Sequence, residues 1–389
     1  AGVCGWLNAR ARLHGPSAGA IVVSWTLVES DAALAAALQS LPAGADIAID
    51  TEFMRTNTFY PKIALLQLFA GDEVYLIDPL AITDLDGLRA MLTDPGRLKV
   101  LHSGSEDLEV FSRWLGILPE PLIDTQRAAA LLGEAGGLGY RNIVERLLGV
   151  ELDKGETRSD WLRRPLTDSQ CHYAAMDVLH LLPVWEILKE RALSADRMPW
   201  LLEEGVELRR AMEDREHEPF RRVKGAGKLN ARQLATLARL VAWREERARN
   251  SDKPRGWVLD DKACVAIARA MPQSQSALED LGVLPPSVLR KQGNVLLDIV
   301  EQSAKLNQDE LPASFPSPLD ERQRGQLKTL KHSAREHAAK IGVAPELMLT
   351  AAELELLVRE RSGEPVKMPR RWAGWRQEMV IRPLRELAA

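Results

Sequence analysis

Apolar residues change their spacing along this chain, and that change limits the folds it can adopt. From Ile21 to about Arg113, short apolar runs alternate with helical stretches at 30–41 and 85–92, which predicts an α/β layer. The middle runs follow one another closely, so we expect antiparallel hairpins within a mixed sheet. The predicted strands are Ile21–Trp25, Asp46–Phe53, Ile63–Phe69, Val74–Asp78 and Leu98–His102.

Beyond Glu106 the apolar residues recur at steps of three and four, which is typical of helices. Helices are predicted at 105–115, 124–132, 140–148 and 168–192, and the rest of the chain reads as all helix. This helical part carries a weak repeat at a constant offset. Leu237 and Leu240 correspond to Leu327 and Leu330, ninety positions later, which favours two copies of one small helical domain.

A chain of 389 residues exceeds what one hydrophobic core usually supports, so we expect several domains. The first twenty residues have no usable period and are interpreted as a poorly structured extension. The segment LPASFPSPL at 311–319 has the Pro and Ser density of a linker. The predicted units are an extension at 1–20, an α/β domain at 21–213, a first helical domain at 214–301, a linker at 302–317 and a second helical domain at 318–389.

Composition excludes several classes of protein. With 46% apolar and 27% charged residues, the chain is neither disordered nor collagenous. Cys4, Cys171 and Cys264 are far apart and odd in number, so neither a disulfide framework nor a cysteine-based zinc site is expected. No apolar run is long enough to span a bilayer. We therefore expect a soluble protein of the reducing cytoplasm, without membrane association, and no obligate protein partner is evident.

A pair of acidic residues ends one of the predicted strands. The sequence IAIDTEF places Asp50 and Glu52 two positions apart, so their side chains point the same way. Adjacent carboxylates at a buried strand end repel each other, and the pKa of at least one rises unless a cation lies between them. Hard divalent ions such as Mg²⁺ suit such clusters. An ordinary strand end that reaches solvent is the alternative reading.

Three further positions also have structural alternatives. Asp107 falls in the first turn of a predicted helix, where acidic residues commonly complement the helix dipole. Tyr173 and Asp177 lie four positions apart and share one face of a helix. A purely structural hydrogen bond between them would produce the same pattern. Their order along the chain, after the D-x-E strand and Asp107, favours a catalytic interpretation.

This ordered set resembles the DEDD exonuclease superfamily in its tyrosine-bearing branch. The flanking words are more specific and resemble the bacterial ribonuclease D family from Ile21 to the C-terminus. They are DTEFMR (50–55), LHSGSEDLEVF (101–111), LIDTQ (122–126) and YAAMDVLHLLPVW (173–185). The resemblance implies a ribonuclease H-like α/β exonuclease domain, followed by two small all-α domains of the helicase-and-RNase-D C-terminal (HRDC) type.

The resemblance also implies an activity. The chain would be a hydrolase that removes nucleoside 5′-monophosphates from RNA 3′ ends with two divalent ions per site, Mg²⁺ or Mn²⁺. Asp50, Glu52 and Asp177 would hold one metal, and Asp50, with Asp107 acting through water, would hold the second. Tyr173 would orient the attacking water. The implied partners are tRNA precursors with 3′ extensions. His102, His172 and His180 flank these motifs, but the metals already supply the hydroxide.

Charge is unevenly distributed despite a formal net charge of −4. Residues 221–255 hold eleven basic and three acidic side chains, which suggests phosphate contacts without sequence readout. A solvated helix face is the alternative. Trp243 and Trp257 could stack on bases, but core packing is the favoured expectation. The candidate nucleic-acid-binding residues are Arg158, Arg221, Arg222, Lys224, Lys228, Arg244 and Arg247, with Arg232 and Arg249 as further phosphate contacts.

Two other functions compete with this interpretation. A DNA 3′–5′ exonuclease of the Werner or proofreading type would share the acidic motifs, and single-strand channels do not reveal sugar preference in sequence. A catalytically inactive RNA-binding protein could keep the same fold. The intact acidic set opposes this second reading, because clustered buried charge without a metal only destabilises a protein.

Overall fold

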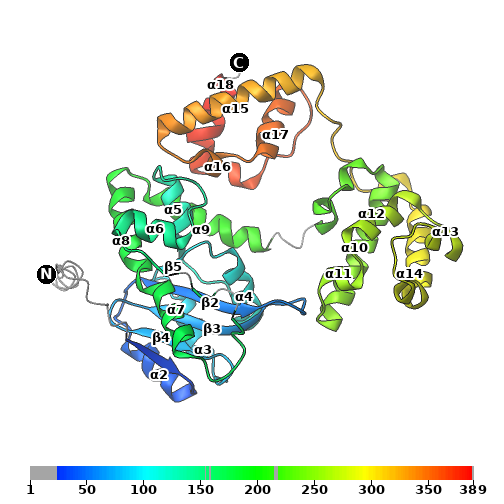
Figure 1. Ribbon diagram of the computed structural model, residues 1–389. Helices are drawn as coiled ribbons and strands as arrows, with labels where there is room; N and C mark the ends of the chain where they lie inside the picture. Colours follow the sequence, from blue (N-terminus) through cyan, green and yellow to red (C-terminus); the bar gives the residue numbers. More distant parts are fainter. Residues whose placement is uncertain (1–23, 154, 157–158, 214–217, 388–389) are drawn as a thin grey trace.

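The computed structural model describes residues 24–153, 155–156, 159–213 and 218–387. Figure 1 shows an α/β domain with a helical domain to one side and a second helical domain above it. The predicted extension at 1–20 lies outside the described residues. Among the described helices, none combines the length and apolarity needed to cross a bilayer.

The α/β domain is built on a six-stranded sheet of order β1-β4-β3-β2-β5-β6. β3 pairs antiparallel with β2 and β4, and the remaining pairs are parallel. The expected mixed sheet is thus confirmed. The strands are β1 (Trp25–Val28), β2 (Ile47–Met54), β3 (Lys62–Phe69), β4 (Val74–Ile77), β5 (Lys99–Leu101) and β6 (Leu122–Asp124).

Two strands differ from the sequence-based expectation. β1 is described at Trp25–Val28, where it pairs with Val74–Ile77 and so continues beyond the predicted end at Trp25; residues 21–23 lie outside the described residues. β6 was not predicted, since its three residues are too few to show a period.

Helices cover both faces of this sheet. On one face the apolar side chains of α2, α3 and α4 join those of Ile47 and Ile49 in one core. On the other face α5 to α8 pack over Ala48 and Leu65. The predicted helix at 168–192 divides at His180 into two. The bounds are α2 (Asp31–Ser40), α3 (Asp86–Thr93), α4 (Ser105–Leu115), α5 (Thr125–Leu131), α6 (Tyr140–Leu148), α7 (Asp168–Leu179), α8 (Leu181–Ser194) and α9 (Met198–Glu213).

The first helical domain has a hydrophobic core of its own. Its longest helix buries Leu234, Leu237 and Leu240 at the helical spacing of one face. Its elements are the 3₁₀ turns η2 (Pro219–Arg222), η3 (Ala226–Lys228) and η4 (Gln308–Glu310), with α10 (Ala231–Ser251), α11 (Arg255–Val258), α12 (Asp261–Ala270), α13 (Gln275–Asp280) and α14 (Pro286–Ala304).

The second helical domain repeats the start of the first. Its first three helices begin ninety residues after α10, α11 and α12, which is the offset of the sequence repeat. Its apolar residues are continuous with the core over α5 to α8 of the α/β domain. Its elements are α15 (Glu321–Ile341), α16 (Pro345–Met348), α17 (Ala351–Arg361), the 3₁₀ turn η5 (Arg370–Trp372), the π-helical turn η6 (Gln377–Ile381) and α18 (Arg382–Leu387).

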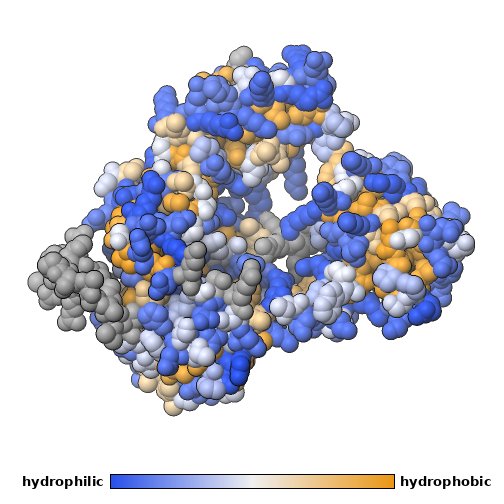
Figure 2. All heavy atoms as spheres, in the orientation of Figure 1, coloured by the Kyte–Doolittle hydropathy of each residue, from blue (hydrophilic) through white to orange (hydrophobic). Residues whose placement is uncertain are grey.

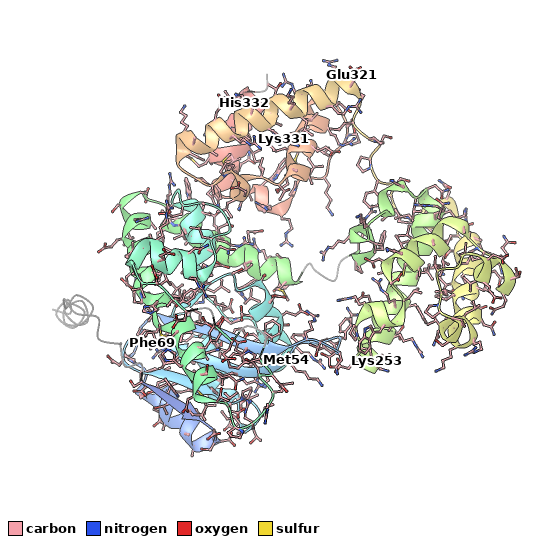
Figure 3. All side chains as sticks on the ribbon, in the orientation of Figure 1. Met54, Phe69, Lys253, Glu321, Lys331 and His332 are labelled. Carbon is pink, nitrogen blue, oxygen red and sulfur yellow. The ribbon has the colours of Figure 1, made fainter. Side chains whose placement is uncertain are left out.

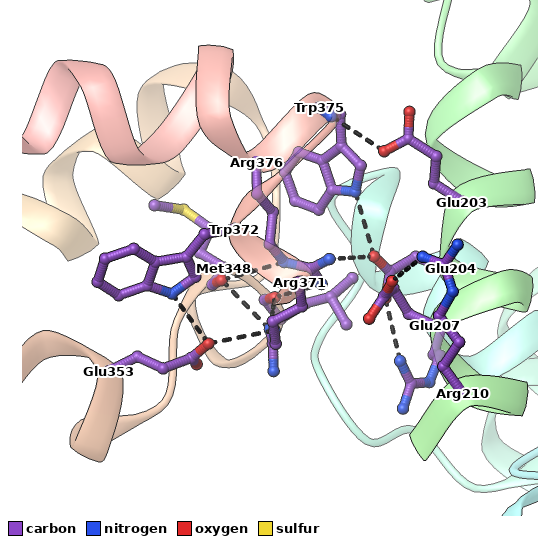
Figure 4. A network of polar contacts seen from close by, with 12 residues as sticks. Glu203, Glu204, Glu207, Arg210, Met348, Glu353, Arg371, Trp372, Trp375 and Arg376 are labelled. Atoms are coloured by element: carbon purple, nitrogen blue, oxygen red, sulfur yellow. Dashed lines mark hydrogen bonds and ion pairs between the residues drawn. The ribbon is translucent and has the colours of Figure 1, made fainter. Parts of the chain in front are cut away.

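A buried ion pair joins the second helical domain to α9. Arg376 Nη1 lies 2.5 Å from Glu204 Oε1, and both side chains are only 2–3% exposed. Glu204 also accepts hydrogen bonds from the Trp375 indole at 3.1 Å and from Arg127 at 3.0 Å (Figure 4). Burial opposes the Glu204 charge, but these partners keep its pKa below the ordinary value. This network sets the angle at which the domain docks.

The first helical domain contacts the α/β domain through the loop after β2. Asp252, between α10 and α11, accepts hydrogen bonds from the backbone N–H groups of Phe59 and Tyr60 at 3.0 and 3.2 Å. The Arg255 guanidinium lies 4.4 Å above the Phe59 ring. Figure 3 marks the two sides of this junction with Met54, which ends β2, and Lys253. Figure 2 shows an opening enclosed between the three domains.

We expect Glu204→Ala to destabilise the protein by about 3–5 kcal/mol, because it leaves the buried Arg376 charge without its partner. Chemical unfolding measures the change. The control is Glu378→Ala, which removes an ion pair with Arg382 whose side chains are 58% and 61% exposed. Its cost should stay below about 1 kcal/mol. Equal destabilisation by the two variants would contradict a docking role for Glu204.

Candidate active site

β2 and α7 bring three carboxylates together. Asp50 and Glu52 project from the face of β2 that α7 covers. Asp177 reaches the same place from α7, and ligand oxygens of the three side chains lie within 4.8 Å of one another. Residues from two segments more than a hundred positions apart therefore form one acidic cluster.

The start and the packing face of α7 determine where Asp177 lies. Thr167 caps the helix and forms a reciprocal capping box with Gln170, which fixes the first turn. Ala174 and Ala175 are fully buried, and their small side chains let the helix approach the sheet closely. Tyr173 lies one turn before Asp177, and burial and then the Asp177 carboxylate raise the pKa of its hydroxyl.

Asp107 lies beside the cluster, in the first turn of α4, and is only 7% exposed. Its Oδ1 accepts a hydrogen bond of 2.5 Å from Thr51 Oγ1, on the β2 residue between Asp50 and Glu52. Its charge also acts on both of these carboxyl groups. Asp107 is thus held at the edge of the site.

Asp124 is a residue that sequence reasoning missed. Its carboxylate accepts hydrogen bonds from the backbone N–H groups of Ser103 and Gly104, at 3.2 and 3.1 Å, in the turn that leads into α4. It also caps α5 through Gln126 N and Arg127 N. Asp124 therefore positions the helix that carries Asp107. The available signal was an Asp ending an apolar run immediately before a helix, which is typical of a cap.

Burial and mutual repulsion dominate the electrostatics of the cluster. Burial raises the pKa of Glu52 to about 8, and the carboxylates of Asp177 and Asp107 add to this rise. Burial likewise raises the pKa of Asp177 to about 7 and that of Asp107 to about 6. The pKa of Asp50 is raised well above its usual range by burial and then by its three acidic neighbours. Acidic groups therefore dominate the charge among the described residues of the site.

This donor set fits divalent cations. The charged groups that most affect the pKa of Asp50 and Glu52 are all other acids of the described residues, so a cation would relieve their repulsion. Oxygen-only ligands at a buried site suit hard ions such as Mg²⁺ or Mn²⁺. The carboxylate cluster thus indicates a divalent metal centre.

Gly155 is a second residue that sequence reasoning missed. It lies against the ring of Tyr173, where any β-carbon would overlap ring atoms Cδ2 and Cε2. Trp161 packs near the same ring, with centroids 6.1 Å apart. No pattern in the sequence links this loop glycine to a tyrosine eighteen positions later.

The described basic residues that were predicted to bind nucleic acid lie in the first helical domain, whereas the acidic cluster lies in the α/β domain. Arg222, Lys224, Lys228 and Arg247 are exposed. Arg221 pairs with Glu218 and donates to the Ala313 carbonyl oxygen of the linker. Arg158 lies outside the described residues.

Two expectations for this domain were wrong, those for Arg244 and Trp257. Arg244 is 5% exposed and pairs with Asp261 at 2.6 Å, so it stabilises the domain interior and is not available to phosphates. The half-buried Arg232 donates to the Ser303, Ala304 and Leu306 carbonyl oxygens at the end of α14, and its phosphate contact stays a prediction. Trp257, expected in the core, is 63% exposed because the short α11 presents it to solvent.

Comparison with known proteins gives the class. Residues 25–192 match the 3′–5′ exonuclease family model, and residues 233–300 match the HRDC domain. The first match spans β1 to α8 and includes the acidic cluster with Tyr173. The fold, the site and these matches define a 3′–5′ exonuclease that carries an HRDC domain.

Full-length relatives narrow this class. Ribonuclease D of Pseudomonas paraeruginosa is 42% identical over 92% of this chain and 95% of its own length. Ribonuclease D of Escherichia coli is 38% identical over 94% of this chain and 98% of its own length. The crystal structure of Escherichia coli RNase D, titled an exoribonuclease involved in structured RNA processing, superposes with a TM-score of 0.85 at 37% identity. That match covers 94% of this chain and 98% of the other. The chain belongs to the ribonuclease D family.

In the metal-free protein, we expect the free energy of unfolding to fall as pH rises from about 4.5 towards 8, because Glu52 must then lose its proton in the folded state. Its folded pKa of about 8 exceeds its ordinary value of 4.5. The folded state therefore binds an extra proton between these values, and the stabilisation, complete below 4.5, is lost as pH rises through the folded pKa. Melting temperatures in EDTA at pH 6 and 8.5 test this. The loss should be smaller in Glu52→Gln, and an equal loss would contradict the assignment.

We expect Gly155→Ala to displace the Tyr173 ring and lower RNA turnover by at least about tenfold, as a misplaced catalytic group does. Single-turnover digestion of 3′-labelled RNA measures the effect. Gly139→Ala is the control, because a β-carbon there meets no atom within 4 Å. Near-normal turnover by Gly155→Ala would show that Tyr173 tolerates the shift.

Proposed function

We propose that this chain hydrolyses RNA one nucleotide at a time from the 3′ end, releasing nucleoside 5′-monophosphates with the help of two divalent cations. Its class, a 3′–5′ exoribonuclease, follows from membership of the ribonuclease D family. The observation that carries the metal-dependent part is the convergence of the Asp50, Glu52 and Asp177 carboxylates within 4.8 Å. This acidic set also opposes an inactive RNA-binding role.

Each site residue has a proposed role. Asp50, Glu52 and Asp177 would hold one cation, and Asp50, with Asp107 acting through water, would hold the second. Bound there, the two ions would lower the pKa of the attacking water and stabilise the leaving 3′ oxygen. Tyr173 would orient that water with its hydroxyl, which lies one helical turn from Asp177. His102 is engaged with Thr125 and the Leu138 carbonyl, so it is not assigned a proton-transfer role.

The proposed substrates are tRNA precursors with 3′ extensions. The opening between the three domains is suited to a single-stranded 3′ end approaching the acidic cluster (Figure 2). Exposed basic side chains of the first helical domain would contact phosphates without reading sequence. These are Arg222, Lys224, Lys228 and Arg247, with the half-buried Arg221 beside them. Arg158, outside the described residues, remains a further candidate by sequence alone.

We place this activity in the cytoplasm. Cys171 and Cys264 are free and buried, which suits a reducing compartment. The proposed substrates, RNA precursors, would be present in that compartment.

We expect Asp50→Asn or Asp177→Asn to lower turnover by more than about a hundredfold, because each removes a proposed metal ligand. RNA affinity should change little, since binding rests largely on the basic helical domain. EDTA should have the same effect as either substitution, and Tyr173→Phe should cost the same or less. The measurement is digestion of 3′-labelled RNA alongside a binding assay. Turnover of Asp50→Asn within a few-fold of wild type would refute the site.

Parallel digestion of RNA and DNA oligonucleotides of matched sequence separates the two nuclease readings. We expect faster loss of RNA. Faster loss of DNA would favour the DNA exonuclease. Binding of a 3′-extended tRNA with no digestion in Mg²⁺ or Mn²⁺ would instead favour the inactive RNA-binding protein.

A further inference from the structure

A polar side chain lies buried beside the acidic cluster without any hydrogen bond. Gln67, on β3, is 0% exposed, and neither its Nε2 nor its Oε1 has a partner in the described structure. A buried amide without partners is costly to a folded protein. A leucine or methionine would fill this position without that cost. The amide therefore calls for a functional explanation.

Strand register places Gln67 next to Asp50. The two residues face each other across the antiparallel β2–β3 pair, so their side chains project from the same face of the sheet. β-carbons in such a pair lie about 4.5–5.5 Å apart, within reach of one hydrogen bond between the side chains. On its other side Gln67 faces Leu76 of β4, which is apolar.

The helix above this pair contributes mainly apolar side chains, apart from Asp177 of the acidic cluster. α7 covers β2, β3 and β4 and buries Ala174, Ala175 and Val178 on this side. These apolar side chains and Leu76 leave Asp50 as the polar side chain that strand pairing brings alongside Gln67. The amide can turn towards Asp50 without displacing the backbone.

We propose that Gln67 is a positioning residue for Asp50: its side-chain N–H donates to the Asp50 carboxylate and fixes its orientation when the site holds its cations. This inference rests on the proposed metal-dependent function. A carboxylate that serves two cations has more lone pairs than they use, so one can accept a hydrogen bond. Partners of this kind orient metal ligands, and their loss typically weakens metal binding.

This role predicts opposite effects on stability and on metal binding. Replacing the amide by an apolar chain of the same length, Gln67→Met, removes the unsatisfied group and should raise the melting temperature of the metal-free protein by about 2–4 °C. The same change removes the donor to Asp50. Affinity for Mn²⁺, measured without RNA by titration calorimetry or by the electron spin resonance of bound Mn²⁺, should fall about 10–100-fold.

Leu76→Met is the matched control, because Leu76 flanks Gln67 on the same face and the swap nearly conserves volume. Its Mn²⁺ affinity should equal that of wild type. If Gln67→Met fails to melt cooperatively, Gln67→Leu replaces it in the same measurements. For either variant, KM for RNA should stay constant while the Mn²⁺ concentration at half-maximal rate rises.

The outcomes are distinguishable. Mn²⁺ affinity within about twofold of wild type in a folded Gln67 variant overturns the positioning role but leaves the proposed function intact. If the wild-type protein binds no Mn²⁺, or if Asp50→Asn binds it equally well, the proposed function and this inference both fail. Weaker Mn²⁺ binding together with higher metal-free stability supports the inference, because a merely structural amide would change stability alone.

Discussion

Repulsion between half-buried carboxylates is the constraint on which the rest of this structure depends. Asp50, Glu52 and Asp177 lie too close to remain charged together without a cation, and burial raises the pKa of each. Packing elsewhere must hold them in this unfavourable arrangement. The sheet fixes Asp50 and Glu52, and the small residues of α7 bring Asp177 against them. Metal-free stability is thereby given up in favour of a binding site.

Residues around the cluster meet the same requirement, because they hold neighbouring site groups in place. Thr51 holds Asp107, Asp124 holds the turn before α4, and Gly155 makes room for the Tyr173 ring. None of these residues is itself an acidic member of the cluster. Together they restrict the orientations of Asp107 and Tyr173. Such restriction lets a metal-dependent site act without reorganising at each turnover.

The two helical domains are attached in different ways. The second shares a continuous apolar core with the α/β domain and is fixed by the buried Glu204–Arg376 pair. The first has a separate core and touches the α/β domain through Asp252 and the loop at Phe59. The second domain is therefore held by an extensive shared core and the first by a smaller polar contact, which leaves the first freer to move relative to the α/β domain.

The sequence by itself determined the local facts: the mixed strand and helix pattern, the period that aligns Asp50 with Glu52, the helical step from Tyr173 to Asp177, and the ninety-residue repeat. These depend on neighbours within a few positions or on self-similarity along the chain. Only the tertiary structure decided that Asp124 serves Asp107, that Arg244 is buried while Trp257 is exposed, and that Gln67 lies beside Asp50. The reason is that such relations depend on strand register and domain packing, which join residues that no local pattern connects.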